Sequence, residues 1–127
     1  MTVTVQWLET GVRRQFSGAT DGTDVLQSNI TLHADNRFEH IDYVLNDFTQ
    51  MTGFFTSGSE IEALVASDST AAQLNPDVTI VLVAQNQALL EWIQHYGDQM
   101  KDAAYGVSVF TELSDAENYI AQMTSGG

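Results

Sequence analysis

The chain has 127 residues, 43% of them hydrophobic, which indicates a single folded domain spanning residues 1–127. Its 17 acidic residues outnumber 4 Lys and Arg, and the formal net charge is −13. This charge argues against binding to nucleic acid or to anionic membrane surfaces. It favours either solubility in a salty environment or a protein partner with a basic surface.

Residue types and segments that are missing disfavour further classes of function. The chain has no Cys, which excludes disulfides, thiolate catalysis and Cys-ligated metal centres. No apolar run approaches the ~18 residues of a membrane span, and the N-terminal segment MTVTVQWLETG lacks the basic region of a signal peptide. We therefore expect a cytoplasmic protein without stable membrane insertion.

The N-terminal segment predicts a β-hairpin. Residues 2–9 alternate in character, with Val3, Val5 and Trp7 on one face, and the turn residues ETG separate them from a second strand, VRRQFSG. Arg13 and Arg14, half of the Lys and Arg residues, fall on this hairpin. Pairing with nearby carboxylates explains these two arginines more simply than anion binding does.

The next segments predict a helix, a polar connection and an inner strand. Thr23 is the expected cap of the helix. The residues expected on its inward side are Val25, Leu26, Ile30 and His33. The polar sequence NRFEH then connects to an apolar strand over 41–48, which ends near Asp47.

The second half of the chain alternates helical and strand patterns. The expected elements are a helix over 57–74, a strand over 78–85, a helix over 86–100, a strand over 105–110 and a helix over 114–123. Capping boxes are expected for Ser57 with Glu60 and for Ser114 with Glu117. The order β-β-α-β-α-β-α-β-α predicts an α/β domain with a mixed, mostly parallel sheet, an N-terminal hairpin and about four helices.

No complete catalytic or metal-binding motif is present. The nucleophile elbow, the zinc-protease motif and the common phosphate- and dinucleotide-binding loops are all missing from the sequence. His33 with Asp35 and His40 with Asp42 carry ligand atoms that zinc or iron accepts, but solvated polar residues explain them more simply. We therefore expect no enzymatic activity, no metal and no cofactor.

The stretch QMTGFFTSGSEIEAL, residues 50–64, is the region with the strongest indication of a site. In open α/β sheets, ligands bind beyond the carboxyl ends of strands, and a helix N-terminus there favours an anion or a phosphorylated Ser. The capping box alone also explains the composition of this stretch. The candidate binding or regulatory residues are Asp47, Thr49, Thr56, Ser57 and Ser59, with Gln85, Asn86, Thr111 and Glu112 ending the neighbouring strands.

The order of elements and two segments, IDYVLNDFTQMTGFFTSGSEIEAL and VFTELSDAENYI, resemble the STAS-type fold. This is the fold of sulphate-transporter and anti-sigma-factor-antagonist domains. The resemblance is closer to the SpoIIAA-like group of small bacterial proteins, in which an initial hairpin precedes the alternating units. It covers most of the chain, and its motifs are mainly apolar, such as the spacing of Phe110, Ala116 and Ile120.

The resemblance also implies a regulatory residue. In the antagonists the strand end reads roughly D-L-S-x-V-x-F-x-D-S-S-G. Residues 47–49 of this chain resemble D-L-S, and residues 56–58 resemble S-S-G after one extra residue. Ser57 would then stand at the phosphoacceptor position. Phe55 stands where the motif has Asp, which removes a carboxylate and adds apolar surface.

Two functions follow from the resemblance. The first is a non-enzymatic regulatory or protein-interaction domain that is switched by phosphorylation of Ser57 and binds a partner protein or a second copy of itself. The alternative rests on similar folds in lipid-carrier domains of the Sec14 type. In that case the protein would bind a small apolar ligand or a lipid in space beneath Phe54, Phe55 and the helix that carries Trp92.

Overall fold

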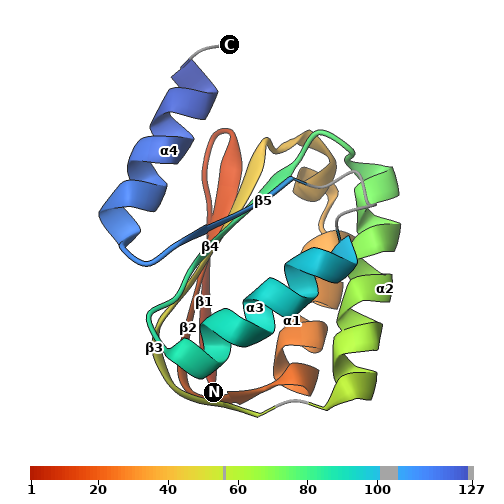
Figure 1. Ribbon diagram of the computed structural model, residues 1–127. Coiled ribbons are helices and arrows are strands. Elements are labelled where there is room, and N and C mark those ends of the chain that lie inside the picture. The colour runs from red at the N-terminus through yellow and green to blue at the C-terminus, as the bar shows by residue number, and fades with distance from the viewer. Residues whose placement is uncertain (56, 101–105, 126–127) are drawn as a thin grey trace.

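The computed structural model describes residues 1–55, 57–100 and 106–125, and these form a five-stranded sheet with helices on both faces (Figure 1). The strands are β1 (Thr2–Trp7), β2 (Gly11–Asp21), β3 (Tyr43–Phe55), β4 (Thr79–Val83) and β5 (Gly106–Phe110). The helices are α1 (Gly22–Ala34), the short 3-10 helix η1 (Asn36–His40), α2 (Gly58–Leu74), α3 (Gln87–Met100) and α4 (Leu113–Ser125). The sheet order is β1-β2-β3-β4-β5, antiparallel between β1 and β2 and parallel elsewhere, which confirms the predicted class and hairpin.

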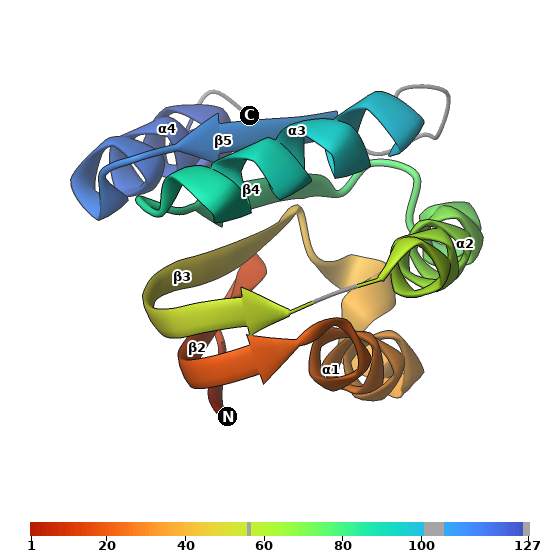
Figure 2. The same cartoon turned by 60° about the horizontal axis from the view of Figure 1, so that its bottom comes forward.

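The sheet separates two apolar cores of unequal size. Helices α1, α2 and α3 cover one face and α4 covers the other (Figures 1 and 2). Alternate residues of a strand point to opposite faces, so β3 sends Val44 and Phe48 into the larger core and Tyr43 and Leu45 into the smaller one. Strand β4 and the first half of β3 are therefore buried on both faces, which explains the nearly continuous apolar sequence of β4.

Strand β3 extends to Phe55 instead of ending near Phe48 as predicted. The polar residues after Phe48 suggested a loop, but they pair with a matching extension of β2 that reaches Asp21. The pairing shifts register twice in this extension, and Gly18 there has a φ of +80°, which favours glycine. Both strands curve in this region (Figure 2). Much of the extension is only partly buried, so its hydrophobic pattern is weak.

The N-cap of helix α1 lies two residues earlier in the chain than predicted. Asp21, not Thr23, is the N-cap: its carboxylate accepts the Asp24 N–H at 2.8 Å, and the Asp24 carboxylate accepts the Asp21 N–H at 3.1 Å. The predicted inward stripe was also wrong at one position, because Ile30 is 56% exposed and its neighbour Asn29 is buried.

Two other local predictions need correction. The sequence NRFEH is not merely a polar connection, since it forms η1 and buries Phe38 completely. Helix α4 begins at Leu113, which places Ser114 inside the helix and not at the cap predicted for it. Within the described ranges, no helix combines the length and apolar character needed to cross a bilayer.

Candidate functional site

The amino end of α2 presents Ser57 and Ser59 at the surface. Ser57 is the N-cap: its Oγ accepts the Glu60 N–H at 3.3 Å, and its N–H donates to the Glu60 carboxylate at 2.9 Å, as the sequence predicted. The hydroxyl oxygens of Ser57 and Ser59 lie 3.1 Å apart. Hydrogen bonds from Thr23, and then from the Ser57 backbone, hold the pKa of Glu60 below its ordinary value, so this carboxylate is ionised at neutral pH. Thr56 lies outside the described residues.

Two phenylalanines next to this cap differ in environment. Phe55 ends β3 with 67% of its surface exposed. Phe54 packs against Trp92 of α3, with ring centroids 4.8 Å apart. Phe54 also lines a cavity of about 40 Å³, which is small for the apolar ligand predicted beneath these rings, and Phe55 lies at the surface. An exposed aromatic ring beside the Ser57 cap gives this end of α2 an apolar contact point.

Asp47 and Thr49 form a separate group on the face of the sheet that α4 covers. Asp47 is buried, and its Oδ1 accepts hydrogen bonds from the Thr49 N–H at 2.9 Å and the Thr49 hydroxyl at 2.6 Å. The Arg13 guanidinium lies 3.8 Å from Asp47 Oδ2 and donates to Glu117 of α4 at 3.2 Å. The pairing predicted for Arg13 is confirmed, and it links β2, β3 and α4. The predicted site residues therefore form two separate groups: Asp47 contacts Thr49, and Ser57 contacts Ser59.

The polar residues that end β4 and β5 have local structural partners. Gln85 donates to the Thr111 carbonyl at 3.1 Å, and Asn86 Oδ1 accepts the Leu89 N–H at 3.1 Å at the start of α3. A cavity of about 40 Å³ brings Gln85 and Asn86 close to Thr49. This volume suits ordered water better than a metabolite.

The two His–Asp pairs considered as metal ligands differ in their surroundings. Nε2 of His33 lies 3.6 Å from the carboxylate of Asp68 in α2. Asp35 binds the Arg37 side chain through both carboxylate oxygens, at 3.0 and 2.8 Å. The other His–Asp pair is exposed around the end of η1. Across residues 1–55, 57–100 and 106–125, no three His, Asp or Glu side chains are grouped to hold a metal ion.

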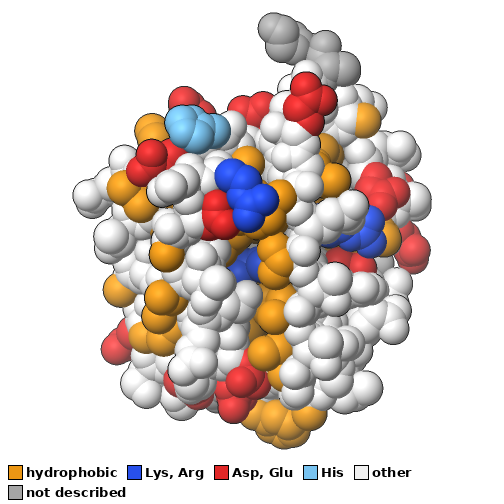
Figure 3. All heavy atoms as spheres, turned by 180° about the vertical axis from the view of Figure 1, so that it is seen from behind, with side chains coloured by type: hydrophobic (Ala, Val, Ile, Leu, Met, Phe, Trp, Pro, Cys, Tyr) orange, Lys and Arg blue, Asp and Glu red, His pale blue; other side chains and the backbone are white. Residues whose placement is uncertain are grey.

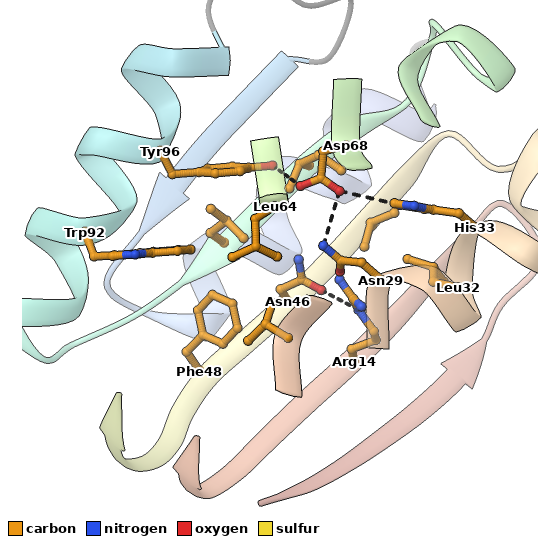
Figure 4. A pocket seen from close by; sticks show the side chains of 14 residues that line it. Arg14, Asn29, Leu32, His33, Asn46, Phe48, Leu64, Asp68, Trp92 and Tyr96 are labelled. Atoms are coloured by element: carbon orange, nitrogen blue, oxygen red, sulfur yellow. Dashed lines mark hydrogen bonds and ion pairs between the residues drawn. The ribbon is translucent and has the colours of Figure 1, made fainter. Parts of the chain in front are cut away.

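A buried polar cluster that the sequence did not predict lies between the sheet and helices α1, α2 and α3 (Figure 4). We call it the interior polar cluster, and it consists of Arg14, Asn29, His33, Asn46, Asp68 and Tyr96. Asp68 accepts hydrogen bonds from Asn29 Nδ2 at 3.2 Å and from the Tyr96 hydroxyl. Together with the approach of His33, these contacts connect α1, α2 and α3 through one carboxylate.

Arg14 is the cationic member of the cluster and is only 3% exposed. Its Nε donates to Asn46 Oδ1 at 2.9 Å, and its Nη1 donates to Ser28 Oγ at 3.0 Å. The guanidinium also lies 5.3 Å from the centre of the Phe16 ring. Because a buried charge is costly unless it is hydrogen-bonded, these contacts make Arg14 an integral part of the core.

A cavity of about 40 Å³ adjoins the interior polar cluster and is also lined by Phe48 and Trp92 (Figure 4). Two buried polar atoms, Asn29 Oδ1 and Trp92 Nε1, make no hydrogen bond to the described part of the chain. A cavity of this size has room for water, and a water molecule needs such polar partners. The site can therefore hold internal water.

Folding shifts the pKa values of Asp68 and His33, two members of the cluster, in opposite directions. Burial raises the pKa of Asp68 from 3.8 to about 6, although the Tyr96 hydrogen bond and the Arg14 charge oppose the rise. Burial, and then the charge of Arg14, lowers the pKa of His33 from 6.5 to about 4. Between these values the folded protein carries the proton on Asp68, whereas the unfolded chain carries it on His33.

These shifts predict a pH dependence that single substitutions should uncover. Asp68 stabilises the fold fully below pH 3.8, and that contribution is lost as the pH rises through about 6. The His33 contribution has the opposite sign and grows as the pH rises from about 4 to 6.5. Asp68→Asn should therefore make stability rise more steeply with pH than in the wild type, by up to about 1.4 kcal/mol per pH unit. His33→Gln should make it rise less steeply.

Urea denaturation at a series of pH values, from 3.5 to 7 in roughly half-unit steps, measures both slopes relative to the wild type. The titrations of all other groups are common to the three proteins and cancel in the comparison. Slopes that do not differ between the variants and the wild type would contradict the assigned shifts.

The sequence carried a weak signal for the cluster. In α2, Asp68 lies midway between the inward residues Leu64 and Ala72, four positions from each. In α1, Asn29 lies four positions after the inward Val25. A polar residue at the centre of an apolar stripe is the feature that would have identified both, because such a position points into the core.

No protein-family model and no curated protein matches the sequence. The anti-sigma factor antagonist SpoIIAA in its unphosphorylated form matches the structure with a TM-score of 0.64 at 11% identity, over 97% of this chain and 98% of that chain. SpoIIAA of Bacillus in the phosphorylated form matches with a TM-score of 0.61 at 10% identity, over 94% and 99%.

Two further solved structures are similar. An anti-sigma factor antagonist from Mycobacterium paratuberculosis has a TM-score of 0.59 at 13% identity, over 94% of this chain and 93% of that chain. An uncharacterized DUF3478-family protein with a SpoIIAA-like fold, from Shewanella loihica, has a TM-score of 0.58 at 15% identity, over 93% and 91%. The chain therefore has the STAS-type, SpoIIAA-like fold that its sequence predicted.

Proposed function

We propose that this protein is a non-enzymatic regulatory domain that binds a partner protein through the amino end of α2, with Ser57 as its phosphorylation switch. The observation that carries the proposal is an exposed N-cap serine beside an exposed Phe55. Support comes from the fold, because solved proteins of this fold include an anti-sigma factor antagonist in unphosphorylated and phosphorylated forms. The net charge of −13 favours a partner with a basic contact surface.

A phosphate on Ser57 would act through the capping box. It would add about −1.5 to −2 charges next to the ionised Glu60. The N–H groups at the start of α2 favour an anion, but the two negative groups repel each other. Glu60 also accepts a hydrogen bond from Thr23 of α1 at 2.8 Å. Displacement of Glu60 would release Thr23, so modification would change both the charge and the contact between the two helices.

Phe55 is the proposed anchor of the contact. Large aromatic side chains often supply much of the binding energy of an interface when they enter a pocket on the partner. The related motif has Asp at this position, so an aromatic ring would select a partner with an apolar pocket. In this proposal Ser59 borders the contact, whereas Asp47 and Thr49 keep β3 in place from the other face of the sheet.

The test compares proteins captured from a lysate of the source organism by the wild type, Ser57→Asp and Ser57→Asn. Asp and Asn are both good N-caps, so α2 is retained in each variant, but only Asp adds negative charge. We expect the same partner with the wild type and Ser57→Asn, and at least about tenfold less of it with Ser57→Asp. Phe55→Ala should also reduce capture, whereas Leu74→Ala, at an exposed position at the other end of α2, should not.

Capture of the same proteins in equal amounts by all variants would overturn the switch, and the absence of any partner would overturn the binding function. Sedimentation equilibrium of the purified proteins covers the case in which the partner is a second copy. A wild-type dimer that dissociates in Ser57→Asp would identify the chain as its own partner. A lipid that co-purifies with the wild type while no partner protein is captured would instead favour the ligand-carrier alternative.

A further inference from the structure

An open groove of about 410 Å³ lies between β1 and α1. Figure 3 shows the molecule from behind, with hydrophobic side chains gathered along a hollow on that face. The volume falls within the range of small-molecule sites. The β1 side is apolar and is made by Met1, Val3, Val5 and Trp7. The α1 side adds the apolar Leu32 but is otherwise polar and includes Gln27, Ser28 and Thr31.

The apolar wall is only partly covered in the protein. Strand β1 is the edge of the sheet, and Val5 and Met1 remain 46% and 47% exposed. Burial of such surface against an aliphatic ligand is favourable, at roughly 25 cal/mol per Å². The groove therefore has a driving force for binding an apolar chain.

The floor of the groove carries a positive charge. Arg14 lines it, and the pairing of Val5 with Arg14 places the guanidinium near the middle of β1. Ser28 Oγ accepts a hydrogen bond from Arg14, so its hydroxyl keeps a hydrogen that it can donate to a ligand. A second cation borders the groove, because the Arg37 guanidinium lies 4.3 Å from the centre of the Trp7 ring. Half of the Lys and Arg residues of a strongly acidic chain thus adjoin one groove.

Acidic residues limit the charge that a ligand can carry. Asp24 and Asp35 line the two ends of the groove, at the first and last turns of α1. A ligand with one negative charge at the centre meets Arg14, but a second negative group towards Asp24 would meet a carboxylate, and the Arg37 cation at the other end is already paired with Asp35. The distance along α1 from Asp24 to Asp35 is roughly 16 Å at 1.5 Å per residue. Because Arg14 lies near the middle of this span, the aliphatic tail of a ligand whose charged group is at Arg14 has room for about half that length.

We propose that this groove binds a small amphipathic monocarboxylate. The carboxylate accepts hydrogen bonds from Arg14 and Ser28, and the aliphatic tail lies on Val3 and Val5 towards Met1. A guanidinium suits the planar geometry of a carboxylate, and the low exposure of Arg14 keeps water from competing for it. Arg14 also belongs to the interior polar cluster. Ligand binding would therefore change the electrostatic environment of the buried residues in that cluster.

Calorimetric titration with octanoate tests the proposal, with octanol as the same tail without charge and acetate as the charge without a tail. We expect octanoate to bind at least about tenfold more tightly than either control. Val5→Trp should fill the groove and weaken octanoate binding by about tenfold or more. Val109→Trp, on the opposite edge strand and similarly exposed at 44% against 46%, should leave it unchanged.

Equal affinity for octanol and octanoate would overturn the role of Arg14. Octanoate binding that survives Val5→Trp would overturn the location, and no heat of binding with millimolar octanoate would overturn the site as a whole. Both Trp variants change exposed positions, so circular dichroism should show folded proteins and the comparison does not depend on an altered core. These outcomes are independent of the partner captured through Ser57.

Discussion

Asp68→Ala is expected to lower the free energy of unfolding by about 3–5 kcal/mol at neutral pH. Asp68 is 8% exposed and connects three helices, since it accepts hydrogen bonds from Asn29 and Tyr96 and lies 3.6 Å from His33. Removal of its carboxylate leaves buried donors without a partner and removes the negative charge that interacts with Arg14. A domain of this size has roughly 5–15 kcal/mol of stability, so the variant should be near the limit of folding.

Two control variants distinguish the loss of the buried Asp68 contacts from the loss of any carboxylate in α2. Glu62→Ala removes an exposed acid from the same helix and should change stability by less than about 0.5 kcal/mol. Asp68→Asn keeps a hydrogen-bonding side chain of the same shape and should cost less than Asp68→Ala. Urea denaturation measures all three, and an equal, small effect of Asp68→Ala and Glu62→Ala would show that the interior polar cluster contributes little to stability.

The fold was predictable because its signals are local and strong. Strand β4 is an apolar run after Thr79, α2 has a capping box at Ser57, and the alternation of β1 identifies a strand. The failures occurred where tertiary pairing decides the structure. The polar end of β3 has no intrinsic strand signal, and it is held by pairing with β2 across two register shifts.

The candidate sites were less predictable than the fold, for a physical reason. A helix cap such as Ser57 is encoded by residues three positions apart and can be recognised in the sequence. The interior polar cluster assembles Arg14, Asn46 and Asp68 from distant elements, and the β1–α1 groove exists only after the sheet has formed. Sequence could show that Asn29 and Asp68 interrupt apolar stripes, but not that they would contact each other.

Phe16→Ala and Phe55→Ala form a matched pair of variants. They test whether the buried ring stabilises the fold while the exposed ring does not. Phe16 is fully buried, lies 5.2 Å from the Phe48 ring between centroids and supports the Arg14 guanidinium, so its loss should cost about 3–5 kcal/mol. Phe55 is 67% exposed, and its replacement should change stability by less than about 0.5 kcal/mol. Urea denaturation of both variants gives the two values directly.

The comparison matters most for the interpretation of partner capture. If Phe55→Ala is as stable as the wild type and still loses the partner, the loss reports a missing contact and not an unfolded domain. A large destabilisation by Phe55→Ala would mean that the ring packs in the fold, and the surface beside Ser57 would then lose its proposed anchor. A hydrophobic side chain that the fold does not need, placed next to an exposed helix cap, is the feature that distinguishes a recognition surface from a structural one.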